Sequence, residues 1–115
     1  MTVTIWHNPR CSKSRATLAL LEENGVTPKV RLYLEDGPSE TELRDAWGAL
    51  GLPASALVRK GEAEFREAKL GTDSSDSALI AAMARHPRLI ERPVVFADGR
   101  AALGRPPEAV LDLFD

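Results

Sequence analysis

Residues 2–25, TVTIWHNPRCSKSRATLALLEENG, carry the pattern that decides the fold. Apolar residues alternate with threonines over residues 2–6, and this alternation is typical of a β-strand. From Ser12 the apolar residues recur at helical spacing instead, and Asn24-Gly25 is a helix stop signal. We therefore expect a strand and a helix joined by a short loop, with the only cysteine of the chain at the start of the helix.

A second strand is expected after this helix. In KVRLYL, residues 29–34, Val30, Leu32 and Leu34 alternate with the other residues, so we expect these three side chains to share one face. A strand, a helix and a second strand in this order predict a right-handed crossover between parallel strands.

The middle of the chain is expected to be helical. Ser39 as N-cap forms a capping box with Glu42 three residues on, and Gly51 closes the helix that follows. The apolar stripe of that helix consists of Leu43, Ala46, Trp47 and Leu50. Further short helices are expected over residues 53–58, 62–69 and 76–86.

A hairpin and a final helix are expected at the C-terminal end. The stretch PVVFADGRAAL, residues 93–103, indicates two strands joined by the turn Asp98-Gly99. The final helix begins at Pro106-Pro107, because proline suits a first helical turn. Its buried residues are expected to be Val110, Leu113 and Phe114.

A βαβ half, a helical insertion and a ββα half together describe the thioredoxin-like α/β architecture, with a small mixed four-stranded sheet. The length of 115 residues suits one compact core, so we expect a single domain over residues 1–115. Hydrophobic residues make up 43% and charged residues 28%, which is ordinary for a globular protein.

The overall charge and the cysteine count exclude several classes of function. A net charge of −2 gives no electrostatic reason to expect nucleic acid or an anionic membrane as partner, and the apolar stretches are too short to span a membrane. No signal peptide is recognisable. A single cysteine forms neither an internal disulfide nor a Cys-rich metal site, so we expect a reduced, cytoplasmic, metal-free domain.

The position of Cys11 indicates a reactive thiol. A helix N-terminus presents unpaired N–H groups and the positive end of the helix dipole, and both stabilise a thiolate. Arg10, Lys13 and Arg15 add positive charge nearby. His7 can contribute by its charge or by a hydrogen bond. The alternative is a buried structural cysteine, the commonest fate of a free thiol, but the polar neighbours favour the reactive interpretation.

The residues after Cys11 restrict the chemistry. Cys11-Ser12-Lys13-Ser14 is a Cys-x-x-Cys motif whose second sulfur is replaced by Ser14, so an adduct on Cys11 has to be resolved by an outside thiol. A Cys-based phosphatase loop needs arginine at the sixth position after cysteine, where this chain has Thr17.

Three arginines at segment boundaries are candidates for binding an oxyanion. A helix N-terminus favours oxyanions, and the arginine fork pairs two oxygens at once. The candidates are Arg59, Arg92 and Arg105. Taken singly, each has an ordinary alternative: a helix C-cap for Arg59, a solvated residue before a strand for Arg92, and a surface loop cation for Arg105.

Five stretches together resemble the glutaredoxin-coupled arsenate reductase family of the thioredoxin superfamily. They are IWHNPRCSKSRATLALLEENG, LYLED, LVRK, HPRLIERPVV and GRPPEAVLDLF, and they follow in the family's order from Val3 nearly to Phe114. The chain is similar to the short members of that family, and the resemblance implies an arsenate reductase domain over residues 1–115.

The resemblance also implies a role for each residue of the site. Cys11 corresponds to the catalytic cysteine, and the oxyanion-binding arginines fall on Arg59, Arg92 and Arg105. Pro93 corresponds to a proline in cis before the third strand, facing the cysteine loop. His7 and Ser14 match positions that support the thiolate.

The implied reaction needs no tightly bound cofactor. The thiolate attacks arsenate and water leaves, after which glutathione as co-substrate and then glutaredoxin supply the remaining electrons and arsenite is released. Two alternatives stay open: a non-enzymatic thiol-state reporter of the same fold, and a glutathione-dependent reductase with another substrate. Regulators of this fold commonly carry a Cys-x-x-Cys switch, which Ser14 denies to this chain.

Overall fold

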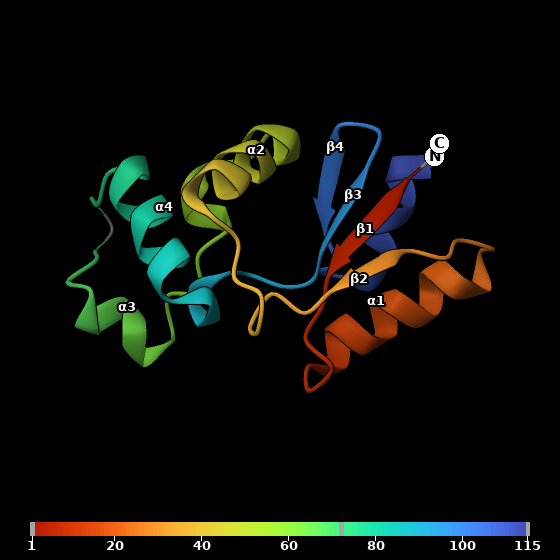
Figure 1. Cartoon of the computed structure of the whole chain (residues 1–115), viewed down its shortest axis with the longest axis horizontal. Helices are drawn as coiled ribbons and strands as arrows, with labels where there is room; N and C mark the ends of the chain where they lie inside the picture. Colours follow the sequence, from red (N-terminus) through yellow and green to blue (C-terminus); the bar gives the residue numbers. More distant parts are fainter. Residues whose placement is uncertain (1, 72, 115) are drawn as a thin grey trace. The chain divides into compact units, whose positions relative to one another are not determined.

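The structure is a computed structural model that describes residues 2–71 and 73–114. The chain forms two compact units. Unit 1 contains the chain up to Asp36 and the chain from Arg92 onward, and unit 2 contains Gly37–Glu91. In Figure 1 unit 1 therefore has the colours of both ends of the sequence, whereas unit 2 runs from yellow to cyan. The expectation of one domain over residues 1–115 stays a prediction.

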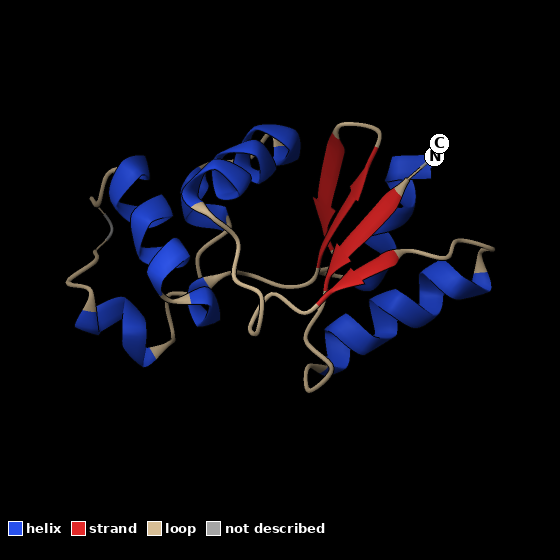
Figure 2. Ribbon diagram, viewed as in Figure 1, coloured by secondary structure: helices blue, strands red, loops and turns tan. Residues whose placement is uncertain are grey.

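Unit 1 is built on a mixed four-stranded sheet with the strand order β2-β1-β3-β4. Strand β2 runs parallel to β1, β3 runs antiparallel to β1, and β4 runs antiparallel to β3. The strands are β1 (Val3–Trp6), β2 (Lys29–Arg31), β3 (Val94–Ala97) and β4 (Arg100–Leu103). Figure 2 shows them in red, and Figure 1 shows β1 beside β3 from the other end of the chain. The predicted thioredoxin-like sheet is confirmed.

The core of unit 1 lies between this sheet and two helices. Helix α1 (Ser12–Glu23) contacts the 3₁₀-helix η3 (Pro107–Phe114), which also contacts β3 and β4. Alternate residues of β1 and β3 supply the strand side of the core, because Ile5 is paired with Val95 in the antiparallel register. The buried residues of the cluster are Val3, Ile5, Leu21, Val95, Ala97, Val110 and Leu113. Burying each of the larger side chains contributes roughly 1.5–3 kcal/mol.

Unit 2 is helical, as predicted for the insertion. Its helices are α2 (Glu40–Leu50), η1 (Ala54–Ala56), α3 (Ala63–Glu67), α4 (Asp76–Arg85) and η2 (Pro87–Leu89). Helix α4 contacts α2, η1 and η2, and its buried residues include Leu79, Ile80 and Met83. An isolated antiparallel bridge between Val58 and Ile90 joins the segment after η1 to the segment after η2. The 3₁₀-helix η2 was not predicted.

The prediction of a strand over residues 29–34 is wrong in its length. Strand β2 ends at Arg31, and Leu32 begins a turn in which its carbonyl accepts hydrogen bonds from the N–H groups of residues 35 and 36. Val30, Leu32 and Leu34, which were expected to share one face, are exposed by 44%, 37% and 43%, whereas Tyr33 is buried. An edge strand pairs on one side only, so a short alternating run can leave the strand conformation early.

The predicted helix cap of α2, its C-terminal glycine and the hairpin turn are confirmed. Ser39 and Glu42 form both hydrogen bonds of the capping box, and Gly51 ends α2 in the left-handed conformation at φ 67°. The hairpin turn has positive φ at both central residues, 50° at Asp98 and 77° at Gly99, which fits the twist of paired strands. The final helix is a 3₁₀-helix in which Phe114 is only partly buried, so that prediction holds in part.

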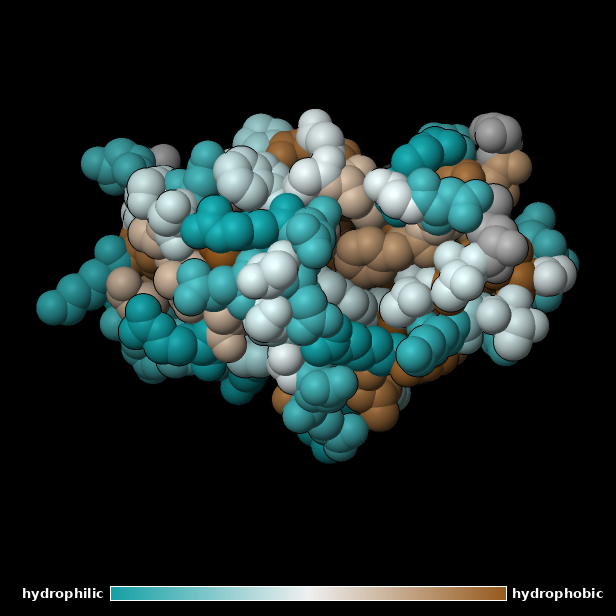
Figure 3. All heavy atoms as spheres, turned by 45° about the horizontal axis from the view of Figure 1, so that its top comes forward, coloured by the Kyte–Doolittle hydropathy of each residue, from teal (hydrophilic) through white to brown (hydrophobic). Residues whose placement is uncertain are grey.

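The surface has mixed character on the face that Figure 3 draws. Hydrophilic side chains cover much of that face, and hydrophobic ones form smaller areas between them. Within residues 2–71 and 73–114, no helix has both the length and the apolar character that crossing a membrane requires.

Candidate active site

Three segments of unit 1 leave the sheet at the same end. The register pairs Trp6, the last residue of β1, with Val94, the first residue of β3, and pairs Val94 with Leu103, the last residue of β4. The segments after β1, before β3 and after β4 therefore all lie at the same end of the sheet. These segments carry HNPRC at residues 7–11, Arg92-Pro93 and Gly104-Arg105.

Cys11 is the N-cap residue of α1. Its backbone is extended, with φ −96° and ψ 123°, its carbonyl accepts the first hydrogen bond of the helix from Arg15 N–H at 3.0 Å, and its side chain is half-buried. No acidic residue lies in the first turn of α1, and Lys13 and Arg15 are exposed there. The helix N-terminus thus offers its dipole and its cations to an anion at Cys11 without a carboxylate of that turn competing.

The loop before Cys11 is fixed by the buried side chain of Ser14. Ser14 Oγ accepts a hydrogen bond from Asn8 N–H at 3.0 Å and shares another with His7 Nδ1 at 2.6 Å. Asn8 in turn binds the loop internally, because its carbonyl accepts from Cys11 N–H at 3.0 Å. The hydroxyl that replaces the second sulfur of a Cys-x-x-Cys motif is therefore a structural anchor of the thiol loop.

His7 is buried and neutral at neutral pH. Burial lowers the pKa of its imidazole below the ordinary value of 6.5, and the positive charge of Arg15 lowers it further. His7 therefore contributes a hydrogen bond to Ser14 rather than a positive charge to the cysteine loop.

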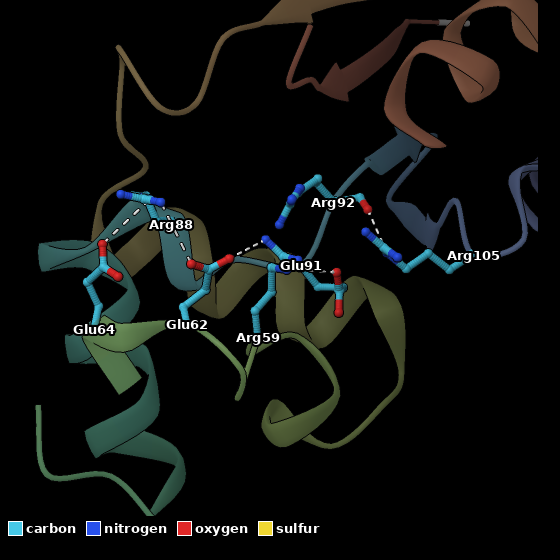
Figure 4. A network of polar contacts seen from close by, with 7 residues as sticks. All are labelled: Arg59, Glu62, Glu64, Arg88, Glu91, Arg92 and Arg105. Atoms are coloured by element: carbon cyan, nitrogen blue, oxygen red, sulfur yellow. Dashed lines mark hydrogen bonds and ion pairs between the residues drawn. The ribbon is translucent and has the colours of Figure 1, made fainter. Parts of the chain in front are cut away.

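Arg92 and Arg105, thirteen residues apart in sequence, are brought together by a hydrogen bond. Arg105 Nε donates to the carbonyl oxygen of Arg92 at 2.9 Å, so the guanidinium of one arginine is held by the backbone of the other (Figure 4). The peptide bonds Arg92–Pro93 and Arg105–Pro106 are both cis.

The absence of a side chain at Gly104 lets the segment after β4 lie close to α1 and to Pro93. Its N–H donates to Pro93 O at 2.9 Å, and a β-carbon on Gly104 would lie 2.5 Å from Thr17 Oγ1 and 2.6 Å from Pro93 Cγ. Glycine is thus required by space at this position, where φ is not positive. Gly104 and Thr17 were not predicted to shape the site, although the Gly-Arg-Pro stretch at residues 104–106 is a local signal for the glycine.

Arg59 belongs to unit 2, where two carboxylates hold it. Its Nη1 lies 2.6 Å from Glu62 Oε1 and its Nε lies 3.7 Å from Glu91 Oε1, with the side chain 28% exposed (Figure 4). The side chain of Arg59 pairs with these carboxylates, and the C-cap residue of the preceding helix η1 is Leu57, so the alternative of a helix C-cap does not apply to Arg59. Glu62 was recognisable from its i, i+3 spacing, but nothing in the local sequence connects Glu91 with Arg59.

Within the described part of the chain, no group of three or more His, Cys, Asp and Glu side chains is arranged to hold a metal ion.

A mixed sheet with βαβ and ββα halves defines a thioredoxin-like protein, and its lone cysteine is the N-cap residue of the first helix. The sequence pattern of the ArsC family matches residues 6–113, and the chain belongs to this family.

Relatives of the chain agree with this assignment over nearly their full length. The chain is 46% identical to a Neisseria meningitidis protein named "Arsenate reductase" over 110 residues, 94% of each protein. It is 52% identical over 113 residues to "Uncharacterized protein YfgD" of Escherichia coli (strain K12), covering 96% of this chain and 95% of that protein. The solved structure "Arsenate reductase from Vibrio cholerae" superposes with a TM-score of 0.94 at 52% identity, covering 98% of both chains.

Proposed function

We propose that this protein reduces arsenate to arsenite, with Cys11 as the nucleophile and with glutathione and glutaredoxin as the electron donors. The observation that carries the proposal is the sheet register, by which the Cys11 loop, Arg92 and Arg105 follow or precede strand termini at the same end of the sheet. A thiol at a helix N-terminus and cations at one place suit attack on an oxyanion. The names of the relatives supply the substrate.

The electron balance accounts for the lone thiol. Cys11 thiolate attacks arsenic, one arsenate oxygen leaves as water, and a sulfur–arsenic bond forms. Reduction to arsenite takes two electrons, which two thiols give up when they form one disulfide. This chain has only one cysteine, so a glutathione thiol provides the second sulfur and arsenite leaves. Glutaredoxin then reduces the resulting mixed disulfide of Cys11 and glutathione. Glutathione is a co-substrate in this scheme, and we place the reaction in the cytoplasm, where thiols stay reduced.

Each residue of the site has a proposed role. Arg92 and Arg105 bind arsenate oxygens, and Arg59 is assigned the same role from its LVRK motif. Ser14 and the neutral His7 hold the thiol loop through their shared hydrogen bond. Each arginine replaced by alanine should lower catalytic efficiency more than tenfold, because a hydrogen bond to a charged group contributes about 1.5–3 kcal/mol. Lysine should restore little, because it offers a point charge instead of a fork.

Mass spectrometry combined with an arsenite assay tests the proposal. Incubation with arsenate and glutathione should add one glutathione to Cys11, and glutaredoxin should remove it while arsenite accumulates. Cys11→Ser should abolish both the adduct and arsenite, because a serine hydroxyl is a far weaker nucleophile than a thiolate. Ser14→Ala should still form the adduct, because Ser14 cannot resolve a disulfide.

A thiol-state reporter behaves differently in the same experiment. Its Cys11 reacts with general oxidants at a rate that arsenate does not change, and no arsenite appears. That outcome would reject the reductase assignment while leaving the thioredoxin-like fold and the reactive thiol in place. Another substrate would show as adduct formation that selenate or a glutathione mixed disulfide stimulates and arsenate does not.

A further inference from the structure

The ion pairs of unit 2 form a chain of alternating charges in which Glu62 occupies the central place. Glu62 Oε1 lies 2.6 Å from Arg59 Nη1, and Glu62 Oε2 lies 3.9 Å from Arg88 Nη2. Arg88 Nε lies 3.6 Å from Glu64 Oε2. Figure 4 shows Glu62 between the two arginines, with Glu64 reached only through Arg88. Glu62 therefore contacts Arg59 directly, whereas Glu64 contacts Arg88 instead.

The backbone on both sides of Arg59 is fixed. Arg59 N–H donates to Leu89 O at 2.7 Å and Glu91 N–H donates to Leu57 O at 2.6 Å, around the bridge between Val58 and Ile90. The remaining freedom of Arg59 is in its long side chain, which has many rotamers. Glu62 at Nη1 and Glu91 at Nε hold two of its three nitrogens.

Glu62 is itself well placed to orient an arginine. It is the N-cap residue of α3, its carbonyl accepts a hydrogen bond from Phe65 N–H at 3.0 Å, and Phe65 is buried. Its side chain is only 21% exposed, so its pair with Arg59 is less screened than a surface pair. The pair of Glu64 with Arg88 lacks this advantage, because Arg88 is 67% exposed.

We propose that Glu62 is a positioning residue for Arg59, which it holds in the rotamer that receives the oxyanion. This inference rests on the proposed role of Arg59 in binding arsenate. An arginine that is ordered before binding loses less side-chain freedom when the oxyanion arrives, and the saving appears as affinity. The five N–H donors of a guanidinium leave room for an oxyanion beside two carboxylates.

Positioning and simple counter-charge predict opposite effects. If Glu62 only placed a negative charge near Arg59, removing it would strengthen arsenate binding and lower KM. If Glu62 orients Arg59, removing it raises KM. Glu62→Gln separates charge from orientation further, because the amide oxygen still accepts from Nη1. Glu64→Ala is the matched control, since it removes a carboxylate of the same network that does not contact Arg59.

Two measurements on the full chain test the inference. In the coupled assay with glutathione, glutaredoxin and NADPH, Glu62→Ala should raise KM for arsenate about three- to tenfold, with kcat within about twofold. Glu62→Gln should raise KM less, and Glu64→Ala should leave it unchanged. In an Arg59→Ala background, Glu62→Ala should have no further effect. Without arsenate, the NMR order parameter of the Arg59 Nε–H bond should fall in Glu62→Ala and stay high in Glu64→Ala.

Several results would overturn the inference. A lower KM for arsenate in Glu62→Ala would mean that the Glu62 carboxylate weakens arsenate binding. Equal KM values for Glu62→Ala and Glu64→Ala would mean that Glu62 does not position Arg59. A rise in KM that persists in the Arg59→Ala background would show a general effect on unit 2. If the wild-type protein makes no arsenite, the proposed function fails by itself, and an unchanged order parameter in Glu62→Ala then rejects the positioning of Arg59 independently.

Discussion

Replacing Gly104 with alanine tests whether the end of β4 approaches α1 as closely as the structure has it. The added β-carbon would lie 2.5 Å from Thr17 Oγ1 and 2.6 Å from Pro93 Cγ, whereas ordinary contact begins at 3.4 Å. Neither neighbour yields easily. Pro93 is a buried ring, and Thr17 is fully buried with its hydroxyl donating to Lys13 O at 2.8 Å.

The expected cost follows from these contacts. Forcing an extra methyl group into a packed site costs typically about 1–3 kcal/mol, and rotating Thr17 away would also give up a hydrogen bond worth about 1 kcal/mol. We expect Gly104→Ala to lower the free energy of unfolding by about 2–3 kcal/mol, or Tm by about 8–12 °C for a chain of this length. Urea and thermal unfolding followed by circular dichroism measure both quantities.

Gly48→Ala is the matched control, because the same substitution should have the opposite sign. Gly48 lies within α2, and a β-carbon there would meet no atom within 4 Å. Alanine is favoured over glycine in a helix interior by about 0.8–1.0 kcal/mol, so Gly48→Ala should stabilise the protein. Removing the Thr17 hydroxyl should reduce the cost of Gly104→Ala. A Gly104→Ala protein as stable as the wild type would refute the close approach.

Three further predictions concern the thiol loop and the edge of the sheet. Ser14→Ala should lower the free energy of unfolding by about 2–3 kcal/mol, because the partly buried N–H of Asn8 and the buried His7 Nδ1 both lose their partner; a loss below about 0.5 kcal/mol in urea titrations would contradict the role of Ser14 as an anchor. The folded pKa of His7 is lowered by burial and by Arg15, so the unfolded chain binds more protons and stability falls as the pH drops below 6.5 toward the folded value. His7→Gln should remove that part of the slope between about pH 7 and pH 5, and an unchanged slope would mean that His7 is not its source. Leu34→Ser should change stability by less than about 0.5 kcal/mol, whereas Leu21→Ala in the core should cost about 2–5 kcal/mol; similar costs would place Leu34 in a core.

Local signals in the sequence predicted most of the secondary structure. The capping box at Ser39, the stop at Asn24-Gly25 and the turn at Asp98-Gly99 each depend on residues that are neighbours in the chain, and each is present. The alternation over residues 29–34 misled, because a period of two shows only that a strand is possible and does not show where pairing stops. Whether an edge strand continues depends on its neighbour, and β1 has no residue left to pair beyond Arg31.

In the candidate site, too, the features that depend on neighbouring residues were predictable and the contacts between distant residues were not. The N-cap position of Cys11 was predictable, since a strand, a short loop and a helix follow one another directly. The contacts of the other candidate residues were not: Ser14 with His7, Arg105 with the carbonyl of Arg92, and Arg59 with Glu91. The last two pairs join residues far apart in sequence, whose distance is set by strand register and by the bridge next to Arg59.

The way each arginine is held bears on what it can contribute to an oxyanion site. The guanidinium of Arg105 donates to a carbonyl oxygen, which orients it. Arg59 lies between two carboxylates, whose combined charge exceeds its own, so its value for an anion lies in direction more than in net charge. An arginine of this kind should be sensitive to rotamer freedom and tolerant of salt, because a short directed hydrogen bond is screened less than a long-range field. The loss that Arg59→Ala causes in catalytic efficiency should therefore vary little between low and physiological ionic strength. A loss that shrinks steeply with added salt would assign Arg59 to long-range attraction of arsenate and remove the reason for the two carboxylates beside it.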